Sequence, residues 1–307
     1  TALAALGKFG VLAPELVQAL ADESVRVQSA AMSFLVQMGD KAVPALVQAL
    51  ADESNRVQTS AVSCLVQMGD KAVPALVQAL GHKKDLVRGS AAIALGKIGV
   101  QAAQAVPALV YQALADESVR VQSSAVRSLV QMGDKAVPAL VQALGDAKER
   151  VRRPARGALV QLGDKAVLPL VQALRDEKEI VRKAAAIALG KIGVQAAQAV
   201  PALVEALRDE IPGVRTAAAL ALGKIGVQAA QAVPALVYQA LRDENAGVRN
   251  AAATALAALG KFGVLAPELV QALADESVRV QSAAMSFLVQ MGDKAVPALV
   301  QALRDEN

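Results

Sequence analysis

Apolar residues follow the chain in pairs of stripes, each with the spacing of one helix face. Within residues 39–69 the first stripe consists of Val43, Leu46, Val47 and Leu50. The second stripe consists of Val57, Ala61, Leu65 and Met68. Because residues at i, i+3, i+4 and i+7 share a helix face, this segment predicts two short amphipathic helices. The polar turn 51–54 joins them.

Glycine, aspartate and proline mark the ends of these predicted helices. Gly39 suits the left-handed conformation that closes a helix, and Asp40 is a candidate N-cap for the next one. Pro44 falls in a first turn, where the missing N–H does least harm. The acids and the hydroxyl of the turn Ala51-Asp52-Glu53-Ser54 are placed to cap the following helix.

The same pattern repeats along the whole chain. Prolines in one context, typically Ala-Val-Pro-Ala-Leu-Val, recur every 30 to 33 residues, at Pro14, Pro44, Pro74, Pro107, Pro138, Pro169, Pro201, Pro234, Pro267 and Pro297. Since neither helix of a unit can bury its stripe alone, neighbouring pairs must stack. We predict an all-α fold, an α-solenoid of antiparallel helix pairs in a right-handed superhelix. Residues 1–307 form one array of about ten units.

Two kinds of insertion interrupt the period. After Gly99, Gly193 and Gly226 the linker is three residues longer, and these residues are helix formers, so we expect one extra turn on the first helix. Tyr111 and Tyr238 are single insertions in Leu-Val-Tyr-Gln-Ala-Leu. The leucines that follow them, Leu114 and Leu241, should still reach the apolar face, at i+8.

Composition and charge narrow the function classes. Hydrophobic residues make up 54% of the chain but aromatic ones only 2%, and the net charge is +4. This small excess of basic residues is spread along the chain and does not form the concentrated basic surface of a nucleic-acid-binding protein. A single cysteine, Cys64, rules out an internal disulfide and is compatible with a reducing compartment such as the cytoplasm. Polar residues interrupt every long apolar run, so we expect no membrane partner.

The segment from Val181 to Gly193, preceded by Leu174-Arg175-Asp176-Glu177, resembles the short HEAT-like repeat of the phycobilisome-lyase type. Consensus-designed proteins built on that repeat look similar, and the resemblance covers the whole chain. It implies a polar ladder between repeats, from an Asp in the turn and an Arg in the second helix. The Arg position is held by Arg88, Arg152, Arg182, Arg215 and Arg249. Gln replaces it at Gln28, Gln58, Gln122 and Gln281, and His82 replaces one Asp, so the ladder is only partly charged.

The family's functions range from bilin-lyase subunits and scaffolds to an iron enzyme, deoxyhypusine hydroxylase. The iron enzyme needs several His-Glu pairs, whereas His82 is the single histidine here and Lys83 follows it. No motif for bilin-lyase chemistry is present either. We therefore expect no enzyme activity, no cofactor and no metal.

The remaining candidates for chemistry have simpler interpretations. His82 reads as a solvated turn residue, since a catalytic base needs positioned partners, and Cys64 reads as a small buried hydrophobe. The Gly-Lys-Ile-Gly stretches lack the Ser or Thr of a phosphate loop and read as helix ends. Four arginines form a cluster, Arg150, Arg152, Arg153 and Arg156. It suits an acidic partner or nucleic acid, but nearby acids favour a solvated or paired face.

Outward positions on the second helices are the candidate binding surface, which we place on the concave side. One position after each Val-Arg or Val-Gln pair stand Ser29, Thr59, Gly89, Ser123, Arg153, Lys183, Thr216, Asn250 and Ser282. Most are small and polar, whereas interface hot spots favour Trp, Tyr and Arg. This composition argues against tight binding of one partner along the whole surface.

The first fifty residues recur without change, since residues 1–50 and 254–303 are identical. Apolar stripes at the two ends are candidate assembly sites, namely Leu3, Leu6 and Phe9 with Val296, Leu299, Val300 and Leu303. We expect a structural or scaffolding protein that joins head to tail into a filament, or a segment of a longer array. The alternative is a modular, natural or designed, protein-binding domain. Both interpretations make the partner a protein, and the first makes it a second copy of the chain.

Overall fold

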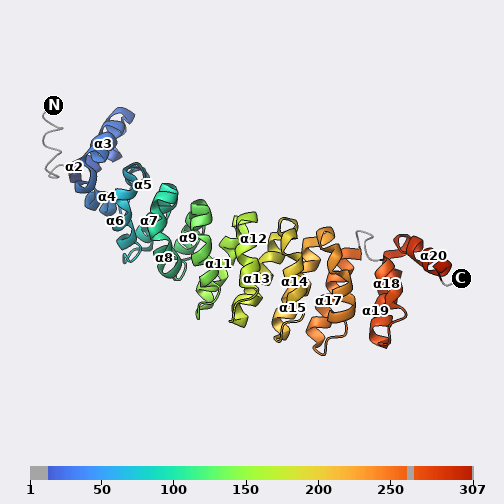
Figure 1. Ribbon diagram of the computed structural model, residues 1–307. Helices are drawn as coiled ribbons and strands as arrows, with labels where there is room; N and C mark the ends of the chain where they lie inside the picture. The colour runs from blue at the N-terminus through green and yellow to red at the C-terminus, as the bar shows by residue number, and fades with distance from the viewer. Residues whose placement is uncertain (1–12, 261–265, 306–307) are drawn as a thin grey trace. The chain divides into compact units, whose positions relative to one another are not determined.

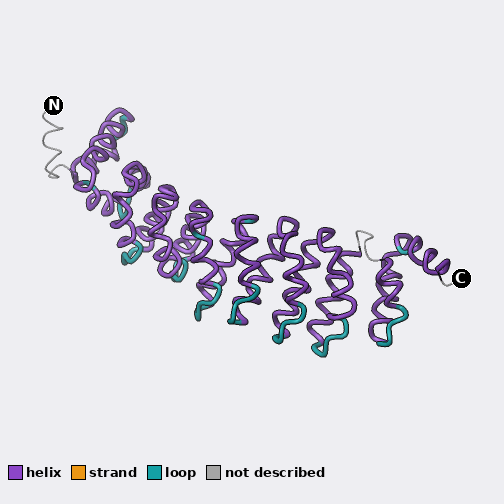
Figure 2. Tube along the Cα trace, in the orientation of Figure 1, coloured by secondary structure: helices purple, strands orange, loops and turns teal. Residues whose placement is uncertain are grey.

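The computed structural model describes residues 13–260 and 266–305, and Figure 1 traces them as a succession of short helices. The chain divides into two compact units, unit 1 (Thr1–Ala158) and unit 2 (Leu159–Asn307). The described residues contain helices and turns and no strand (Figure 2). The predicted all-α, α-solenoid class is confirmed. That a single array spans residues 1–307 stays a prediction.

Each repeat contributes a shorter first helix and a longer second helix. In unit 1 the first helices are α2 (Ala13–Gln18), α4 (Val43–Ala49), α6 (Val73–Ala79), α8 (Val106–Ala108) and α10 (Val137–Ala143). The second helices are α3 (Val25–Met38), α5 (Asn55–Met68), α7 (Asp85–Ile98) and α9 (Val119–Met132). Helix α11 (Glu149–Leu162) is also a second helix, and the division between the units falls within it.

Unit 2 follows the same plan. Its first helices are α12 (Asp164–Ala173), α14 (Val200–Ala206), α16 (Val233–Ala235), α18 (Ala266–Ala272) and α20 (Val296–Asp305). Its second helices are α13 (Glu179–Ile192), α15 (Pro212–Ile225), α17 (Ala246–Gly260) and α19 (Val278–Met291).

Short 3-10 turns occur in both units. They are η1 (Ala19–Ala21), η2 (Gly39–Lys41), η3 (Gly69–Ala72), η6 (Gly133–Lys135) and η10 (Gly292–Lys294).

The predicted apolar stripes form the core of each unit. In the repeat of α4 and α5, seven of the eight predicted stripe residues are buried, and Val47 is half-buried. Leu46 of the first helix and Leu65 of the second are fully covered. Because these leucines recur in every repeat, stacked helix pairs share one continuous apolar layer within each unit.

The helix ends differ from the prediction at both predicted caps. Gly39 has φ +56° and closes α3, as expected. Asp40, however, makes no side-chain cap and lies inside the 3-10 turn η2. The N-cap residue of α5, Ser54, makes no side-chain cap either, and instead Asp52 Oδ1 accepts the Ser54 N–H at 2.8 Å. An Asp side chain readily bonds the backbone two residues further on, and this bond fixes the turn that starts α5.

The expected extra turn of first helix is wrong. The longer linkers form 3-10 segments instead, namely η4 (Gly99–Ala105), η7 (Gly193–Ala199) and η8 (Gly226–Ala232). Ala102 leaves helical geometry at φ −94° and ψ 19°, and both Ala102 and Ala105 are buried. A 3-10 turn takes about three residues, so three extra residues are absorbed without rotating the helix that follows.

The two tyrosine insertions are absorbed by π-helical turns, η5 (Leu109–Ala113) and η9 (Leu236–Ala240). The Leu114 N–H donates to the Leu109 carbonyl at 2.9 Å, which is an i→i+5 bond. Leu114 and Leu241 are both buried, so the prediction that they reach the core at i+8 is confirmed. The π turn accommodates one extra residue while the stripe keeps its direction.

Glycines in three second helices allow close approach of the neighbouring helix. A Cβ on Gly190 of α13 would lie 2.8 Å from Ala221 Cα of α15, and one on Gly223 would lie 2.7 Å from Ala255 Cα of α17. In unit 1, Gly96 of α7 meets Ser128 of α9 in the same way. These distances leave no room for a methyl group, so glycine sets the spacing of these helices.

Three helical stretches are long and apolar enough to cross a membrane by length and composition, namely Asp85–Ala113, Glu179–Ala206 and Pro212–Tyr238. In each of them a glycine with positive φ ends the second helix, as Gly99 does at +71°. Helix α7 therefore has 14 residues and measures about 21 Å, against a hydrocarbon layer of about 30 Å. The expectation of no membrane partner stays a prediction.

Candidate functional site

The turn aspartates are held by their own backbone before they contact any other repeat. Asp116 Oδ1 accepts the Ser118 N–H at 2.8 Å, and Asp209 Oδ1 accepts the Ile211 N–H at 2.9 Å. Each carboxylate is thus fixed at the start of a second helix, with its outer oxygens facing the preceding repeat. The local sequence Asp-Glu-x therefore positions an acceptor at the same place in successive units.

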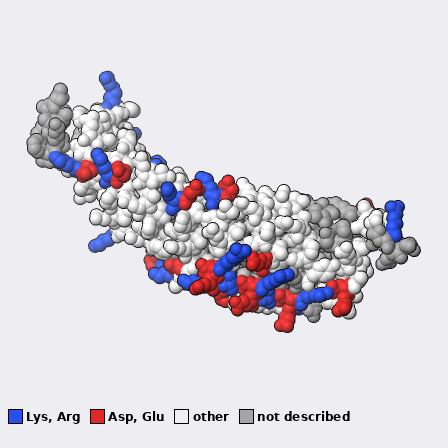
Figure 3. Space-filling view, viewed as in Figure 1, with Lys and Arg blue, Asp and Glu red and all other residues white. Residues whose placement is uncertain are grey.

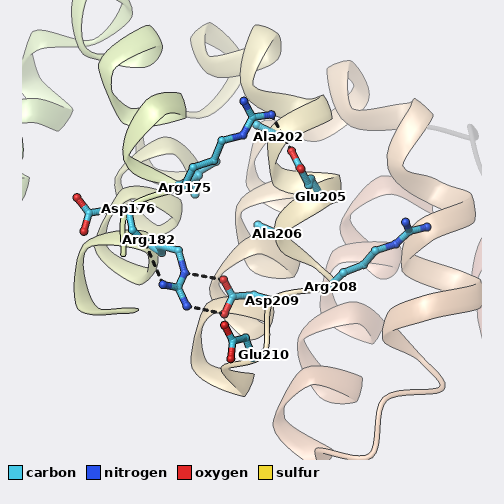
Figure 4. Close-up of a pocket in the computed structure, with 10 residues that line it drawn as sticks. Arg175, Asp176, Arg182, Ala202, Glu205, Ala206, Arg208, Asp209 and Glu210 are labelled. Atoms are coloured by element: carbon cyan, nitrogen blue, oxygen red, sulfur yellow. Dashed lines mark hydrogen bonds and ion pairs between the residues drawn. The ribbon is translucent and has the colours of Figure 1, made fainter. Parts of the chain in front are cut away.

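Arginines of the preceding second helices bind these carboxylates through two parallel bonds. Arg182 donates from Nε and Nη2 to Asp209 at 2.7 and 3.0 Å, and Nη1 donates to the carbonyl of Asp176 at 3.0 Å (Figure 4). Arg88 binds Asp116 at 2.6 and 2.9 Å, and Arg215 binds Asp243 at the same two distances. One guanidinium therefore ties its own turn to the next one.

The hydrogen bonds of the ladder lower the pKa of its aspartates. Partial burial acts to raise the pKa of Asp209, but hydrogen bonds from Arg182 and from the Ile211 N–H outweigh it and hold the pKa below its usual value. The same balance lowers the pKa of Asp116 and of Asp243. The carboxylates stay charged at neutral pH, which keeps the bidentate bonds at full strength.

Glutamine reproduces only half of the arginine's role. Gln58 and Gln122 donate to the carbonyls of Asp52 and Asp116, each at 2.6 Å, and Gln28 makes the same bond to Asp22. This bond closes the turn within one repeat, whereas an amide is too short to reach the next carboxylate as well. The prediction of a partly charged ladder is confirmed for the described residues.

Two arginines at ladder positions bind elsewhere. Arg249 donates to the carbonyls of Asp243 and Glu244 at 2.8 and 2.6 Å, and the next turn aspartate, Asp275, is bound by Arg242. Arg152 donates from Nε to Glu149 of its own helix at 2.9 Å. The ladder motif thus predicts which arginines are partly buried and hydrogen-bonded, but it does not predict which acidic residue each arginine binds.

A groove of about 510 Å³ lies in unit 2 between the turns that follow α12 and α14 (Figure 4). Leu174 and Ala206 form its apolar floor, and the pair Arg182–Asp209 lies on one side. On another side Arg175 reaches across to Glu205 at 2.8 Å, and this pair is exposed. Figure 3 shows acidic and basic side chains gathered along the turn edge of unit 2. The groove suits a polar or amphipathic side chain of a partner.

Sequence reasoning did not find this groove, although a signal for it exists. Glu205 replaces the Gln of the usual Val-Gln-Ala-Leu segment, and Arg175 replaces the Ala or Gly that precedes Asp in several other turns. The two changes occur in consecutive repeats and pair across them. A comparison of equivalent positions between repeats would have identified the pair.

The predicted second-helix surface lies on α3, α5, α9 and α11 in unit 1 and on α13, α15, α17 and α19 in unit 2. Exposed there are Ser29, Thr59, Ser123, Arg153, Lys183, Asn250 and Ser282, and Thr216 is half-exposed. Gly89 is buried instead, because the Arg120 side chain of the next second helix lies over it. The structure brings these positions to solvent, and their role in binding stays a prediction.

The predicted assembly residues are described in part. Leu3, Leu6 and Phe9 lie outside the described residues, as does the side chain of Leu303. Val296, Leu299 and Val300 of α20 are 50%, 36% and 41% exposed. Their counterparts in the identical segment of unit 1, Val43 and Leu46, are 5% and 0% exposed. The corresponding residues are therefore more buried in α4, which packs against α5 of its own repeat and against α2 and α6 of the neighbouring repeats.

The other candidates for chemistry take structural positions. His82 is exposed, and its Nδ1 accepts the Lys84 N–H at 3.1 Å, so it closes the turn as Asp does elsewhere. Cys64 is buried, and burial raises the pKa of its thiol to about 11. No group of three potential metal-ligating side chains occurs among the residues that the structure describes.

The arginine cluster separates into two kinds of side chain. Arg152 lies against its helix and is bound to Glu149 and to backbone carbonyls. Arg150 comes within 3.9 Å of Glu117, with both side chains largely exposed. Arg153 and Arg156 have no hydrogen bond or ion pair within the described part of the chain. The paired interpretation therefore holds for Arg152 and the solvated one for Arg150 and Arg153, whereas Arg156 is half-buried.

Solved structures share this fold. The karyopherin Kap121p bound to the SUMO protease Ulp1p is 15% identical, with 96% of this chain covered and a TM-score of 0.56. Kap121p bound to Nup53p is 16% identical, with 94% covered and a TM-score of 0.55. The present chain spans 38% of either solved chain. No curated protein sequence matches the chain.

A family model for HEAT repeats matches residues 1–65, 43–111, 106–173, 167–257 and 233–307. The overlapping matches cover the chain from one end to the other, in step with the helix pairs and the turn ladder described above. The chain therefore belongs to the HEAT-repeat family.

Proposed function

We propose that the chain is a scaffold that holds protein partners against the exposed surface of its second helices. The observation that carries this proposal is the exposure of the same helix position in both units, from Ser29 to Ser282, with Thr216 half-exposed and Gly89 buried. A surface of this kind offers many weak contacts in register with the repeats. The solved Kap121p complexes, which contain Nup53p or Ulp1p, support the use of this fold for protein partners.

The composition of the surface sets the expected strength of binding. Ser29, Thr59 and Ser123 are small, and the Thr59 hydroxyl already donates to the carbonyl of Asn55 at 2.9 Å. Such positions contribute complementarity and not anchoring energy. We expect affinity to come from the few long side chains among them, such as Arg153 and Lys183, and to fall steeply when these are removed.

Selection from a random peptide library on the immobilised chain tests the proposal. Peptides that the chain retains should lose binding to a variant with Thr59→Glu and Lys183→Glu. They should keep binding to a control with Gln142→Glu and Gln172→Glu, two exposed first-helix positions. Retained peptides that respond only to the first-helix changes, or no retained peptide at all, would contradict the proposal.

End-to-end joining of copies is a second candidate, and one observation favours it. The face formed by Val296, Leu299 and Val300 is exposed on α20, but in the identical helix α4 the counterparts Val43 and Leu46 are buried and Val47 is half-buried. At the opposite end of the sequence, Leu3 and Leu6 have identical counterparts, Leu256 and Leu259, that are fully buried in unit 2. We propose that the face on α20 accepts the first repeat of a second copy.

The repeat type is a further proposal. The segment from Val181 to Gly193 resembles the phycobilisome-lyase type of HEAT-like repeat, and the bidentate Arg–Asp ladder agrees with that type. Absence of enzyme activity, cofactor and metal likewise belongs to this proposal, together with the absence of nucleic-acid and membrane partners.

A further inference from the structure

We propose that four arginines on α9 and α11 of unit 1 form a docking surface for an acidic protein segment. We call them the arginine patch, and they are Arg120, Arg127, Arg150 and Arg153. The inference rests on the proposed binding through the second helices, and it names the chemistry of one partner. Only Arg153 of this set belongs to the surface row predicted from the repeat pattern.

Helix geometry places the patch on one side of two consecutive second helices. Arg120 and Arg127 are seven residues apart in α9, so they point in nearly the same direction about 10.5 Å apart. Arg150 of α11 occupies the position that Arg120 has in α9, and Arg153 follows one turn later. Arg150 lies 3.9 Å from Glu117, in the turn that precedes α9, which shows that the two helix starts are neighbours.

The four guanidinium groups are available for a partner. All four residues are exposed. Arg120, Arg127 and Arg153 make no hydrogen bond or ion pair within the described part of the chain, and the contact of Arg150 with Glu117 is long. Side chains that hold the fold behave differently, since Arg152 and Arg88 are largely covered and bound by several acceptors. The four patch arginines therefore take no part in the Arg–Asp ladder.

Small neighbours make room at the patch. Arg120 Nε lies 3.8 Å from the place of a Cβ on Gly89, where other repeats carry Ser, Thr, Arg, Lys or Asn. The surface beside Gly157, at the position equivalent to Arg127, is open within 4 Å. The Arg120 side chain lies against Gly89, and a long acidic side chain of a partner can approach beside Gly157 without meeting another side chain there.

Carboxylates of a protein segment fit this patch better than a phosphate chain. Guanidinium binds either anion bidentately, so the surroundings decide. Glu117 and Glu149 stand at the helix starts next to Arg150 and repel a chain whose negative charge is continuous, as in a nucleic acid, whereas a protein segment can place uncharged residues opposite them. The patch contains no aromatic side chain on which a base could stack. An extended acidic segment with carboxylates about three residues apart matches the 10.5 Å spacing.

Binding of a fluorescent peptide of about fifteen residues, with Glu at every third position and uncharged residues between, to the 307-residue chain tests this inference. A variant with all four patch arginines changed to Gln should bind at least tenfold more weakly. The control variant carries Lys83→Gln, Lys84→Gln, Lys191→Gln and Lys224→Gln, four exposed lysines with the same total charge change. It should bind within twofold of the parent. Circular dichroism and thermal melting should show both variants folded, and binding should weaken as salt rises.

Three results would overturn the inference. They are no binding of the peptide to the parent, an equal loss in both variants, and tighter binding of a single-stranded oligonucleotide at the same four arginines. The last result would identify a nucleic-acid surface. Failure here is distinguishable from failure of the proposed function, because library peptides that depend on Thr59 and Lys183 would then still be retained.

Discussion

At the scale of single residues, the repeats differ in which side chains join them. Arg182 closes its own turn and binds Asp209 of the next, whereas Gln58 at the same position only closes its turn. The sequence could predict this difference, because the length and charge of the side chain decide it. The sequence could not predict that Arg242 binds Asp275, because this choice of partner depends on the packing of the side chains around α17.

The ladder predicts a pH dependence of stability. The pKa of Asp209 in the folded chain is below the value of an aspartate in the unfolded chain. Its contribution to the free energy of unfolding is therefore complete above about pH 4 and is lost as pH falls through the folded pKa. Arg182→Gln should cost about 1.5–3 kcal/mol at pH 7. The difference in melting temperature from the parent should shrink toward pH 2. Arg153→Gln, at an exposed site, is the control and should show no such trend.

Glycine spacing gives a second prediction at this scale. Gly190→Ala should lower stability by about 1–3 kcal/mol, because the new methyl would meet the backbone of α15 at Ala221. Gly157→Ala meets nothing within 4 Å and should raise stability by up to about 1 kcal/mol through helix propensity. Urea unfolding measures both changes. Equal effects of the two substitutions would show that helix contact does not set these positions.

At the scale of helices, stripe spacing predicted which faces are buried, and the structure confirms it from Val43 to Met68, with Val47 half-buried. Stripe spacing did not predict the backbone geometry that absorbs a change in length, although it placed Leu114 and Leu241 in the core correctly. The three added residues after Gly99 form a 3-10 segment, and the one added at Tyr111 forms a π turn. Periodicity at 3.6 residues carries no signal for either, because both keep the core leucines in place.

Removal of one residue tests the π turn. Deleting Tyr111 should restore the regular Leu-Val-Gln-Ala-Leu segment and leave Leu114 buried, so the melting temperature should stay within about 2 °C or rise. Deleting Gln142 from the regular helix α10 is the control. It rotates Leu144 by about 100° away from the core and should cost more than about 2 kcal/mol. Similar losses in both deletions would argue against the π-turn account.

At the scale of the whole molecule, identical sequence meets different surroundings. The two copies of the fifty-residue segment end in the same helix, which begins at Val43 in the first copy and at Val296 in the second. Val43 is buried, whereas Val296 is exposed. The sequence could identify the repeated block and its apolar face. It could not say what covers the face on α20, because burial there depends on neighbours and not on the helix itself.

Light scattering tests joining of copies through this face. The parent chain should show an average mass that rises with concentration, and Val296→Lys with Leu299→Lys should hold it at the monomer value with unchanged helicity. Val100→Lys, at an exposed valine of η4, is the control and should assemble like the parent. A parent chain that stays monomeric at high concentration would contradict end-to-end joining.

The proposed scaffold function rests on the face that partners contact, and thiol protection measures that face directly. Cys64 is buried and its thiol pKa is about 11, so a single new surface cysteine reacts alone with maleimide. A library-selected peptide should slow labelling of Ser123→Cys or Ser282→Cys on the second helices at least fivefold. It should leave Gln142→Cys and Gln172→Cys on the first helices unchanged. Protection of the first-helix cysteines alone would contradict the account.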